Sequence, residues 1–179
     1  MSKIKKNKGI VFWVTGMPGS GKTSISKKIK KFIEKKFGPT LLINGDDLRE
    51  IFDIKGYTKN NRFKIAKYYS LYCKFISDQK INLIFTTGSL FHKVHNLNKK
   101  ILTNYIEILI MSEINILKRK KNKSFYQKKT NNVWGVDISV QFPKKPDIIL
   151  NNNYKLNINE LSKKLISEIK MLNKLKNIK

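Results

Sequence analysis

The sequence predicts an α/β fold in which helices cover both faces of a five-stranded parallel sheet. Two observations predict it. Short apolar runs of strand length alternate with longer segments of helical periodicity along the 179 residues. The first apolar run leads directly into a glycine-rich segment, residues 16–23, which a helical pattern follows. In a sheet of this kind the strands are parallel, and ligands bind at their shared carboxyl edge.

Residues 16–23 read G-M-P-G-S-G-K-T and fit the G-x-x-x-x-G-K-T pattern of a phosphate-binding loop, or P-loop. The glycines let several backbone N–H groups turn toward one anion, and the following helix adds the positive end of its dipole. Lys22 of this pattern contacts the β- and γ-phosphates, and the Thr23 hydroxyl ligates Mg²⁺. We expect the whole loop to bind a nucleotide phosphate: Gly16, Met17, Pro18, Gly19, Ser20, Gly21, Lys22 and Thr23. A glycine-rich turn without a ligand is the alternative, which the order of strand, loop and helix disfavours.

The first part of the chain supplies two strands and two helices. Residues 10–15 are an apolar run typical of a buried parallel strand. The helix after the P-loop repeats apolar residues at helical spacing and stops at Gly38-Pro39, near residue 37. Residues 40–43 are the second strand, and the chain then turns into a short helix that ends near Phe52. Asp46 can cap this short helix.

A long helix is predicted over about 60–79, after a loop at 53–60. Its inward face is expected to carry Ile65, Tyr68, Tyr69, Tyr72, Phe75 and Ile76. Tyrosines at this spacing favour core packing over stacking on nucleic-acid bases. Cys73, in the same helix, is expected to be a buried thiol. A single cysteine excludes an internal disulfide and fits a reducing cytoplasm.

The remaining elements follow the same alternation. We expect a strand at 81–85 with a loop at 86–89, a helix over about 91–103 and a strand at 105–110. Ser112 caps a helix that ends near Lys120, and residues 147–150 are the fifth strand. Asn157 caps a final helix, whose inner face carries Ile158, Leu161, Leu165, Ile169 and Leu172.

Residues 120–146 break this pattern. They are basic and weakly periodic, and long segments of this kind inside a compact domain are usually functional. Beside a P-loop we expect them to form a lid over bound phosphates. With a basic tail at 1–9 and no linker or repeat, residues 1–179 are predicted to form one domain of the P-loop kinase type.

The net charge of +26 raises the question of polyanion partners. The lysines are spread along the whole chain rather than gathered in one stripe. Lys, Asn and Ile also share A/T-rich codons, so a biased genome can produce this composition without a functional cause. Nucleic-acid binding is therefore kept as an alternative and not expected as the main function. No apolar run approaches the roughly 20 residues of a membrane span, so no membrane partner is expected. Only three of the 38 basic residues are arginines, Arg49, Arg62 and Arg119, which makes them candidates for sites that need a planar, bidentate cation. His92 and His95 are expected in packing or surface roles.

Polar residues at the carboxyl ends of the strands predict phosphoryl transfer, which requires mainly positioning and charge neutralisation. Asp46 follows the second strand and can organise Mg²⁺ or orient an acceptor hydroxyl; a plain helix cap is its alternative role. Arg49 lies on the same face of the short helix, where an anionic acceptor would find it, and Arg62 opens the long helix near the same edge. Ser89 lies in the loop after the third strand. Arg119 can stabilise transferring phosphate or stack on a base, or it can serve as a C-terminal helix charge.

Several segments resemble the motifs of adenylylsulfate kinases. Residues 43–49 resemble L-D-G-D-x-x-R, and residues 56–62 resemble G-[FY]-[ST]-x-x-D-R. Ser89 matches the serine of I-S-P-[FY]-R, and residues 132–137 resemble N-V-V-G-V-D. Phe125-Tyr126 resembles the G-L-Y of the family's lid, and residues 146–150 resemble N-P-D-[IL]-V-[IL]. These motifs occur in the family's order over about residues 10–170.

The resemblance implies transfer of the γ-phosphate of ATP to the ribose 3′-hydroxyl of adenylylsulfate, with Mg²⁺, to give 3′-phosphoadenylylsulfate. It implies catalytic roles for Lys22, Asp46 and Ser89, and Mg²⁺ binding by Thr23 and Asp46. Ser89 is expected to be mainly an acceptor ligand rather than a phosphoserine intermediate. Arg119 would contact ATP. The acceptor would be bound by Asp46, Arg49, Tyr57, Arg62 and Ser89.

The acceptor side departs from the family's pattern, whereas the P-loop matches it fully. Asn44 and Asn61 stand where the family has acids, and Ile65 stands where it has an asparagine. Leu90 and His92 replace the proline and arginine after the serine, and Asn131 replaces a lysine. Because lost hydrogen-bond partners change specificity strongly, another nucleotide is a rival acceptor, as in the cytidine diphosphoramidate kinase of capsule biosynthesis in the same branch. The pathway stays open between sulfate assimilation, sulfation-donor supply and capsule modification. The oligomeric state stays open too; family members are often dimers.

Overall fold

Five parallel strands form one sheet in the computed structural model, which describes residues 7–119 and 132–175. The strands lie in the order β2-β3-β1-β4-β5, and all neighbours are parallel. They span Val11–Gly16 (β1), Thr40–Asn44 (β2), Asn82–Thr87 (β3), Tyr105–Met111 (β4) and Ile148–Asn151 (β5). The predicted α/β fold with a five-stranded parallel sheet is confirmed.

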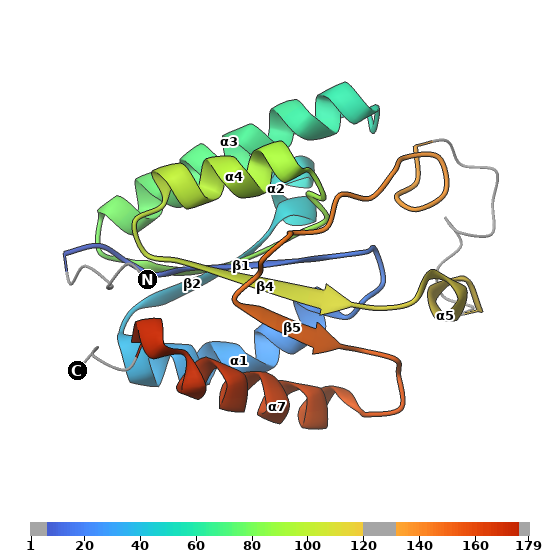
Figure 1. Ribbon diagram of the computed structural model, residues 1–179. Coiled ribbons are helices and arrows are strands. Elements are labelled where there is room, and N and C mark those ends of the chain that lie inside the picture. The colour runs from blue at the N-terminus through green and yellow to red at the C-terminus, as the bar shows by residue number, and fades with distance from the viewer. Residues whose placement is uncertain (1–6, 120–131, 176–179) are drawn as a thin grey trace.

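Helices cover both faces of this sheet (Figure 1). On one side lie α1 (Lys22–Phe37) and α7 (Ile158–Met171), and on the other lie α2 (Gly45–Ile51), α3 (Lys59–Asp78) and α4 (His92–Ile101). The short α5 (Ile114–Arg119) follows β4 beyond the edge of the sheet, and a 3₁₀ turn, η1 (Asn173–Leu175), follows α7. The described residues include no helix long and apolar enough to cross a bilayer.

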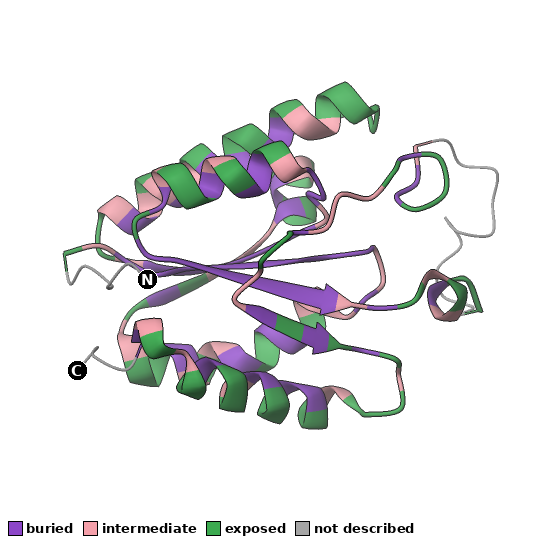
Figure 2. Ribbon diagram, viewed as in Figure 1, coloured by how far each residue is buried: buried purple, intermediate pink, exposed green. Residues whose placement is uncertain are grey.

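Two hydrophobic clusters, one on each face, fix the helices to the sheet. Side chains of β1 alternate between them, because successive residues of a strand point to opposite faces. Trp13 packs with α3 and α4 and stacks on Phe85 of β3, with ring centroids 5.1 Å apart, whereas Phe12 packs toward α1 and α7. All six residues of β1 and of β3 are buried, and β1 is purple along its length in Figure 2. The central strands therefore hold the carboxyl edge of the sheet in a fixed position.

The predicted cap of the final helix is confirmed. Asn157 accepts from the N–H of Glu160 at 3.0 Å, and the Glu160 carboxylate accepts from the N–H of Asn157 at 2.8 Å. This capping box satisfies two N–H groups that the helix itself leaves unpaired.

Two other predicted caps are wrong. The side chain of Asn44, not of Asp46, caps α2, because the helix already begins at Gly45. Helix α5 begins at Ile114, one residue too late for a cap at Ser112, and the Ser112 hydroxyl donates to the carbonyl of Asn152 at 2.9 Å. The threonines expected in a loop after the third strand belong to β3, which continues to Thr87.

The inward face of α3 is rotated from the predicted one. Ile65, Tyr69 and Cys73 are buried, but Tyr68 and Phe75 are 54% and 65% exposed. Tyr68 points roughly 60° away from Ile65 around the helix, since each residue turns the helix by about 100°. Cys73 is the buried thiol that was expected, and burial raises its pKa well above the ordinary value.

Candidate functional site

A pocket of about 410 Å³ lies where β1, β2 and β3 end. Its walls are the P-loop, the beginnings of α2 and α3, the loop after β3, Trp134 and the connection between β5 and α7. Most of the predicted site residues line it: Pro18, Gly19, Gly21, Lys22, Thr23, Asp46, Arg49, Tyr57, Arg62 and Ser89. Gly16, Met17, Ser20 and Arg119 do not line it, and Arg119 is exposed at the end of α5.

The P-loop connects β1 to α1 with the backbone that its glycines permit. Gly16 and Gly21 have φ angles of +152° and +91°, which L side chains rarely adopt. A Cβ atom on Gly16 would also stand 2.3 Å from the carbonyl oxygen of Ile110. Lys22 donates from Nζ to the carbonyls of Gly16 at 3.0 Å and Met17 at 2.9 Å, so its ammonium group is held across the loop. The N-terminus of α1 and this ammonium group together suit phosphate oxygens.

Two residues of the β5–α7 connection form hydrogen bonds with the backbone of the P-loop, and neither was predicted as a site residue. The buried Asn152 amide donates to the carbonyl of Ser20 at 2.9 Å, and the Tyr154 hydroxyl donates to the carbonyl of Gly19. Burial raises the pKa of Tyr154, so the hydroxyl keeps the proton that it donates. One signal was available in the sequence: Asn152 directly follows the fifth strand, whose end lies on the ligand-binding edge.

Asp46 and Asp47 differ in their surroundings although both are exposed at the start of α2. Asp47 accepts from the Asn44 amide at 2.9 Å, while Asp46 lines the pocket together with Thr23 of the P-loop. Within residues 7–119 and 132–175, no three His, Cys, Asp or Glu side chains gather as a metal site. Any Mg²⁺ here would therefore take part of its oxygen ligands from substrate phosphates and water, which is the usual behaviour of this ion.

Arg49, Arg62 and Tyr57 form one cluster on the far wall of the pocket. The two guanidinium groups lie 4.3 and 5.0 Å from the centroid of the Tyr57 ring. Arg49 donates to the carbonyl of Gly56 at 2.6 Å, and Arg62 donates to the carbonyls of Tyr57 at 2.9 Å and Asn132 at 2.8 Å. Burial and the neighbouring charge of Arg49 lower the pKa of Arg62. Two cations held this close favour an anionic ligand between them.

Ser89 is buried at the floor of the pocket. Its hydroxyl lies 2.8 Å from that of Thr87, and its N–H donates to the same Thr87 oxygen at 3.2 Å. Thr15 of β1 lies beside this pair and contacts the Ser89 carbonyl at 3.5 Å. Thr87 of β3 therefore positions the Ser89 hydroxyl and Thr15 of β1 contacts its backbone, as expected around a ligand-orienting group.

Trp134 lines the pocket but was not predicted as a site residue, because it was considered only as part of the motif at residues 132–137. It is 1% exposed, packs edge-on against Phe91 at 4.9 Å, and lies 5.6 Å from the guanidinium of Arg62. A short β-bridge to Ile138 and a hydrogen bond from the Val133 N–H to Asp137 fold the segment that carries it. Residues 120–131, with Phe125-Tyr126 and Asn131 of the predicted lid, lie outside the described residues.

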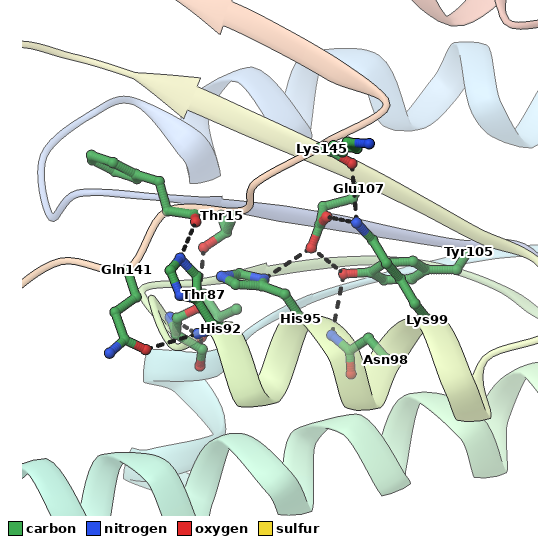
Figure 3. A network of polar contacts seen from close by, with 12 residues as sticks. Thr15, Thr87, His92, His95, Asn98, Lys99, Tyr105, Glu107, Gln141 and Lys145 are labelled. Carbon is green, nitrogen blue, oxygen red and sulfur yellow. Dashed lines mark hydrogen bonds and ion pairs between the residues drawn. The ribbon is translucent and has the colours of Figure 1, made fainter.

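A second polar cluster, whose residues are not among those that line the pocket, lies between α4 and β4 (Figure 3). Glu107 of β4 is fully buried, with Nδ1 of His95 2.9 Å and Nζ of Lys99 3.1 Å from its carboxylate oxygens. The Tyr105 hydroxyl donates to the same carboxylate at 2.8 Å. Burial alone would raise the pKa of Glu107, but His95, Tyr105 and Lys99 bring it below its ordinary value. The cluster packs α4 onto β4, and His95 has the packing role expected of it.

The comparisons with known proteins agree with this geometry. The sequence profile described as adenylylsulphate kinase matches residues 8–151. A cytidine diphosphoramidate kinase of Campylobacter jejuni is 33% identical over 168 residues, which cover 92% of this chain and 98% of that protein. An adenylyl-sulfate kinase of Clostridium acetobutylicum is 30% identical over 152 residues, covering 82% of this chain and 76% of that protein.

The solved structure of the Mycobacterium tuberculosis APS kinase CysC, in complex with AMPPNP and APS, has the same fold. Its TM-score with this chain is 0.78 at 22% sequence identity, with 91% of this chain and 98% of that one covered. The matching sequence profile includes the P-loop, α2, α3, Ser89 and Trp134, which are the main walls of the pocket. The chain therefore belongs to the adenylylsulphate kinase family, whose members are ATP-dependent phosphotransferases with the P-loop kinase fold.

Proposed function

We propose that this enzyme transfers the γ-phosphate of ATP to the ribose 3′-hydroxyl of a cytidine nucleotide, cytidine diphosphoramidate, with residues 1–179 acting as one kinase domain. The observation that carries the proposal is the 33% identity to the Campylobacter jejuni cytidine diphosphoramidate kinase along 98% of its length. The departures of Asn44, Asn61 and Ile65 from the adenylylsulfate kinase pattern point the same way. Adenylylsulfate is the second candidate, because the Clostridium acetobutylicum adenylyl-sulfate kinase is 30% identical.

The donor side is proposed to bind the phosphates of ATP. The loop amides and the Lys22 ammonium would contact the β- and γ-phosphates, where positive charge neutralises the developing charge of phosphoryl transfer. Thr23 and Asp46 line one pocket and would supply the hard oxygen atoms that Mg²⁺ prefers, so they fit the ion. When bound, Mg²⁺ would neutralise phosphate charge. Arg119 lies outside the pocket lining, so the contact with ATP proposed for it would lie beyond the pocket, where the proposed 120–146 lid begins.

The acceptor side is proposed to bind an anionic nucleotide. Arg49 and Arg62 would contact its phosphate groups, and the Tyr57 ring, which is half exposed, would contact its base. Ser89 would position the acceptor rather than carry a phosphate, because its hydroxyl already pairs with Thr87. The Asp46 carboxylate would orient the ribose hydroxyl toward the γ-phosphate.

A panel of acceptors tests the proposal. Release of ADP from ATP and Mg²⁺ is measured with cytidine diphosphoramidate, with adenylylsulfate and with the matching nucleosides. We expect turnover with the cytidine nucleotide and a kcat/KM at least about tenfold lower with adenylylsulfate. Turnover of adenylylsulfate alone would overturn the proposal.

The matched controls are Lys22→Ala, which should abolish turnover of every acceptor, and Lys27→Ala, an exposed lysine of α1 that should leave it unchanged. Turnover that survives Lys22→Ala would mean that the measured ADP comes from a contaminating enzyme. Light scattering on the same preparation measures whether the protein forms the homodimer that the family resemblance leaves open.

A further inference from the structure

We propose that the indole N–H of Trp134 donates a hydrogen bond to a phosphate oxygen of the acceptor nucleotide and thereby helps to select the acceptor. The inference rests on the proposed function only in so far as the acceptor is a nucleotide with a phosphate. It assigns a specificity role to a residue that the motif resemblance does not explain, because the family's N-V-V-G-V-D pattern has valine where this chain has Trp134.

The first observation is an unpaired donor in the pocket wall. Trp134 is 1% exposed and its Nε1 has no hydrogen-bond partner among the residues that the structure describes. A buried N–H without a partner destabilises the folded protein. Nε1 of Trp13 is unpaired among the described residues too, but only Trp134 of these two tryptophans lines the pocket, where a ligand can reach it. A bound ligand would be the missing partner.

The second observation is the position of this N–H. A Cβ atom placed on Gly88 would lie 3.8 Å from Nε1 of Trp134, and Gly88 itself lines the pocket. Gly88 therefore stands beside the indole N–H and has no side chain that would cover it. A small shift of the backbone at Gly88, between β3 and Ser89, would open the N–H to a ligand atom.

The third observation identifies the chemistry of that ligand atom. Nε of Arg49 is also buried and unpaired among the described residues, and it belongs to the same pocket. Indole and guanidinium N–H groups can only donate, so the ligand must bring atoms that accept. Two guanidinium charges at the same wall favour an acceptor atom that is also anionic, and phosphate oxygen is both.

The position of Ile65 gives the inference a consequence for specificity. Ile65 lines the pocket where the resembling motif has an asparagine, so one amide donor is missing from this wall. Trp134 supplies an N–H to the same pocket from another segment of the chain. A site that hydrogen-bonds its ligand rejects analogues that lack the bonding atom, which makes this donor a discriminating group.

Trp134→Phe tests the inference, with CDP and cytidine as the probes. The substitution removes the N–H and keeps an aromatic ring beside Arg62. We expect the Kd of CDP, measured by calorimetry, to rise at least about tenfold, because a hydrogen bond to a charged group is lost, and the Kd of cytidine to stay within about twofold. The Kd of ATP and the melting temperature show whether the fold is retained.

Trp13→Phe is the matched control. Trp13 is the other of the two tryptophans, is fully buried, and its Nε1 likewise has no partner within the part of the chain that the structure describes. It does not line the pocket, so its loss should leave the Kd of CDP unchanged. In this variant Trp134 is the sole tryptophan. Its fluorescence should change on addition of CDP and saturate at the calorimetric Kd, and the emission of Trp134→Phe should not change.

The possible outcomes separate the two proposals. Equal weakening of CDP and cytidine by Trp134→Phe, or an unchanged Kd of CDP, would overturn the role of the indole N–H while leaving a cytidine acceptor intact. If the native enzyme binds adenylylsulfate and not CDP, the cytidine acceptor is wrong, and the same comparison with adenylylsulfate and adenosine decides the role of Trp134. Gly88→Ala, which adds a methyl group in front of Nε1, should imitate Trp134→Phe in either case.

Discussion

The three arginines of this lysine-rich chain differ in what surrounds them. Arg49 and Arg62 share the ring of Tyr57 inside the pocket, and Arg119 is exposed outside its lining. Arg62 uses two edges of its guanidinium at once, on the carbonyls of Tyr57 and Asn132, and so joins α3 to the segment of Trp134. A lysine cannot bond in this forked geometry, which gives a physical reason for arginine here.

Arg62→Lys is therefore expected to raise the KM of the acceptor about tenfold or more, while the KM of ATP changes by less than about threefold. The charge is kept, so the effect measures the lost fork and the lost contact with Tyr57. Steady-state kinetics with both substrates varied checks this. Arg119→Lys is the control and should leave the acceptor KM unchanged; an acceptor KM that responds equally to both substitutions would contradict the role of Arg62.

The site residues that the sequence predicts correctly are those that come shortly after the end of a strand. Asp46, Arg49 and Ser89 were placed at the carboxyl edge from the strand pattern, and the structure brings them to one pocket. Trp134 and Tyr154 were not found, because their positions depend on how irregular segments fold back onto the P-loop and the wall of α3. Local patterns carry little information about such tertiary contacts.

At the scale of elements, the connection between β5 and α7 supports the P-loop. Asn152 reaches the Ser20 carbonyl, and its own N–H donates to Met111 of β4 at 2.8 Å, so one buried residue joins the sheet to the loop. A Cβ atom on Gly21 would stand 3.0 Å from the same amide. The shape of the P-loop therefore depends on this connection as well as on its glycines.

Asn152→Ala should loosen the P-loop. It leaves the Ser20 carbonyl without its partner, which costs about 1–3 kcal/mol of unfolding free energy, or ~2–4 °C of melting temperature per kcal/mol. The KM of ATP should rise several-fold while the acceptor KM stays close to that of the native enzyme. Asn157→Ala, which removes the cap of α7 and costs ~1 kcal/mol, is the control. It should lower the melting temperature without changing the KM of ATP, and equal effects of the two variants on that KM would contradict the bracing role.

Elements also show where sequence patterns reach their limit. Helices and strands were predicted because apolar residues repeat with periods that local sequence displays. The predicted capping residues of α2 and α5 are wrong because a shift of one residue in the start of a helix changes which side chain caps it. The predicted inward face of α3 is partly wrong because a periodic pattern assigns every apolar residue to the core, whereas Tyr68 and Phe75 are exposed.

The cluster around Glu107 joins α4 to β4 and predicts an acid-sensitive contribution to stability. The pKa of Glu107 is lowered from its ordinary value of 4.5, so its ionised form is favoured in the folded state. That stabilisation is complete above the unfolded pKa and is lost as the pH falls through the folded pKa. His95, Lys99 and Tyr105 contact the carboxylate and stabilise its negative charge.

Glu107→Gln should therefore be less stable than the native protein near neutral pH, by about 3–5 kcal/mol if His95 and Lys99 are left unpaired. The difference should shrink as the pH falls below 4.5 and through the lowered pKa of the folded state, because protonation removes the charge from the native carboxylate as well. Urea unfolding at a series of pH values measures both. Exposed Glu50→Gln is the control and should change stability little at any pH; a Glu107→Gln difference that is constant with pH would contradict the role of its charge.

At the scale of the whole molecule, the charge of +26 is distributed rather than focused. Exposed lysines occur on α1 and α7 on one side of the sheet and on α3 and α4 on the other, as the exposed positions in Figure 2 illustrate. Proteins that bind nucleic acid through the phosphate backbone gather their cations along one face or stripe. In the described residues the exposed lysines lie on helices of both faces of the sheet rather than on one, whereas Lys22, Arg49 and Arg62 line one pocket.

We therefore expect only weak, salt-sensitive binding of RNA or DNA, with a Kd of about 10⁻⁴–10⁻⁶ M at physiological salt, typical of non-specific electrostatic attraction. Fluorescence anisotropy of a labelled single strand, measured across salt concentrations, checks this. ATP turnover should be insensitive to added RNA at physiological salt, because the polyanion would occupy scattered lysines and not the P-loop. Tight binding at physiological salt, or competition between RNA and ATP, would contradict this expectation and would assign the lysines a function of their own.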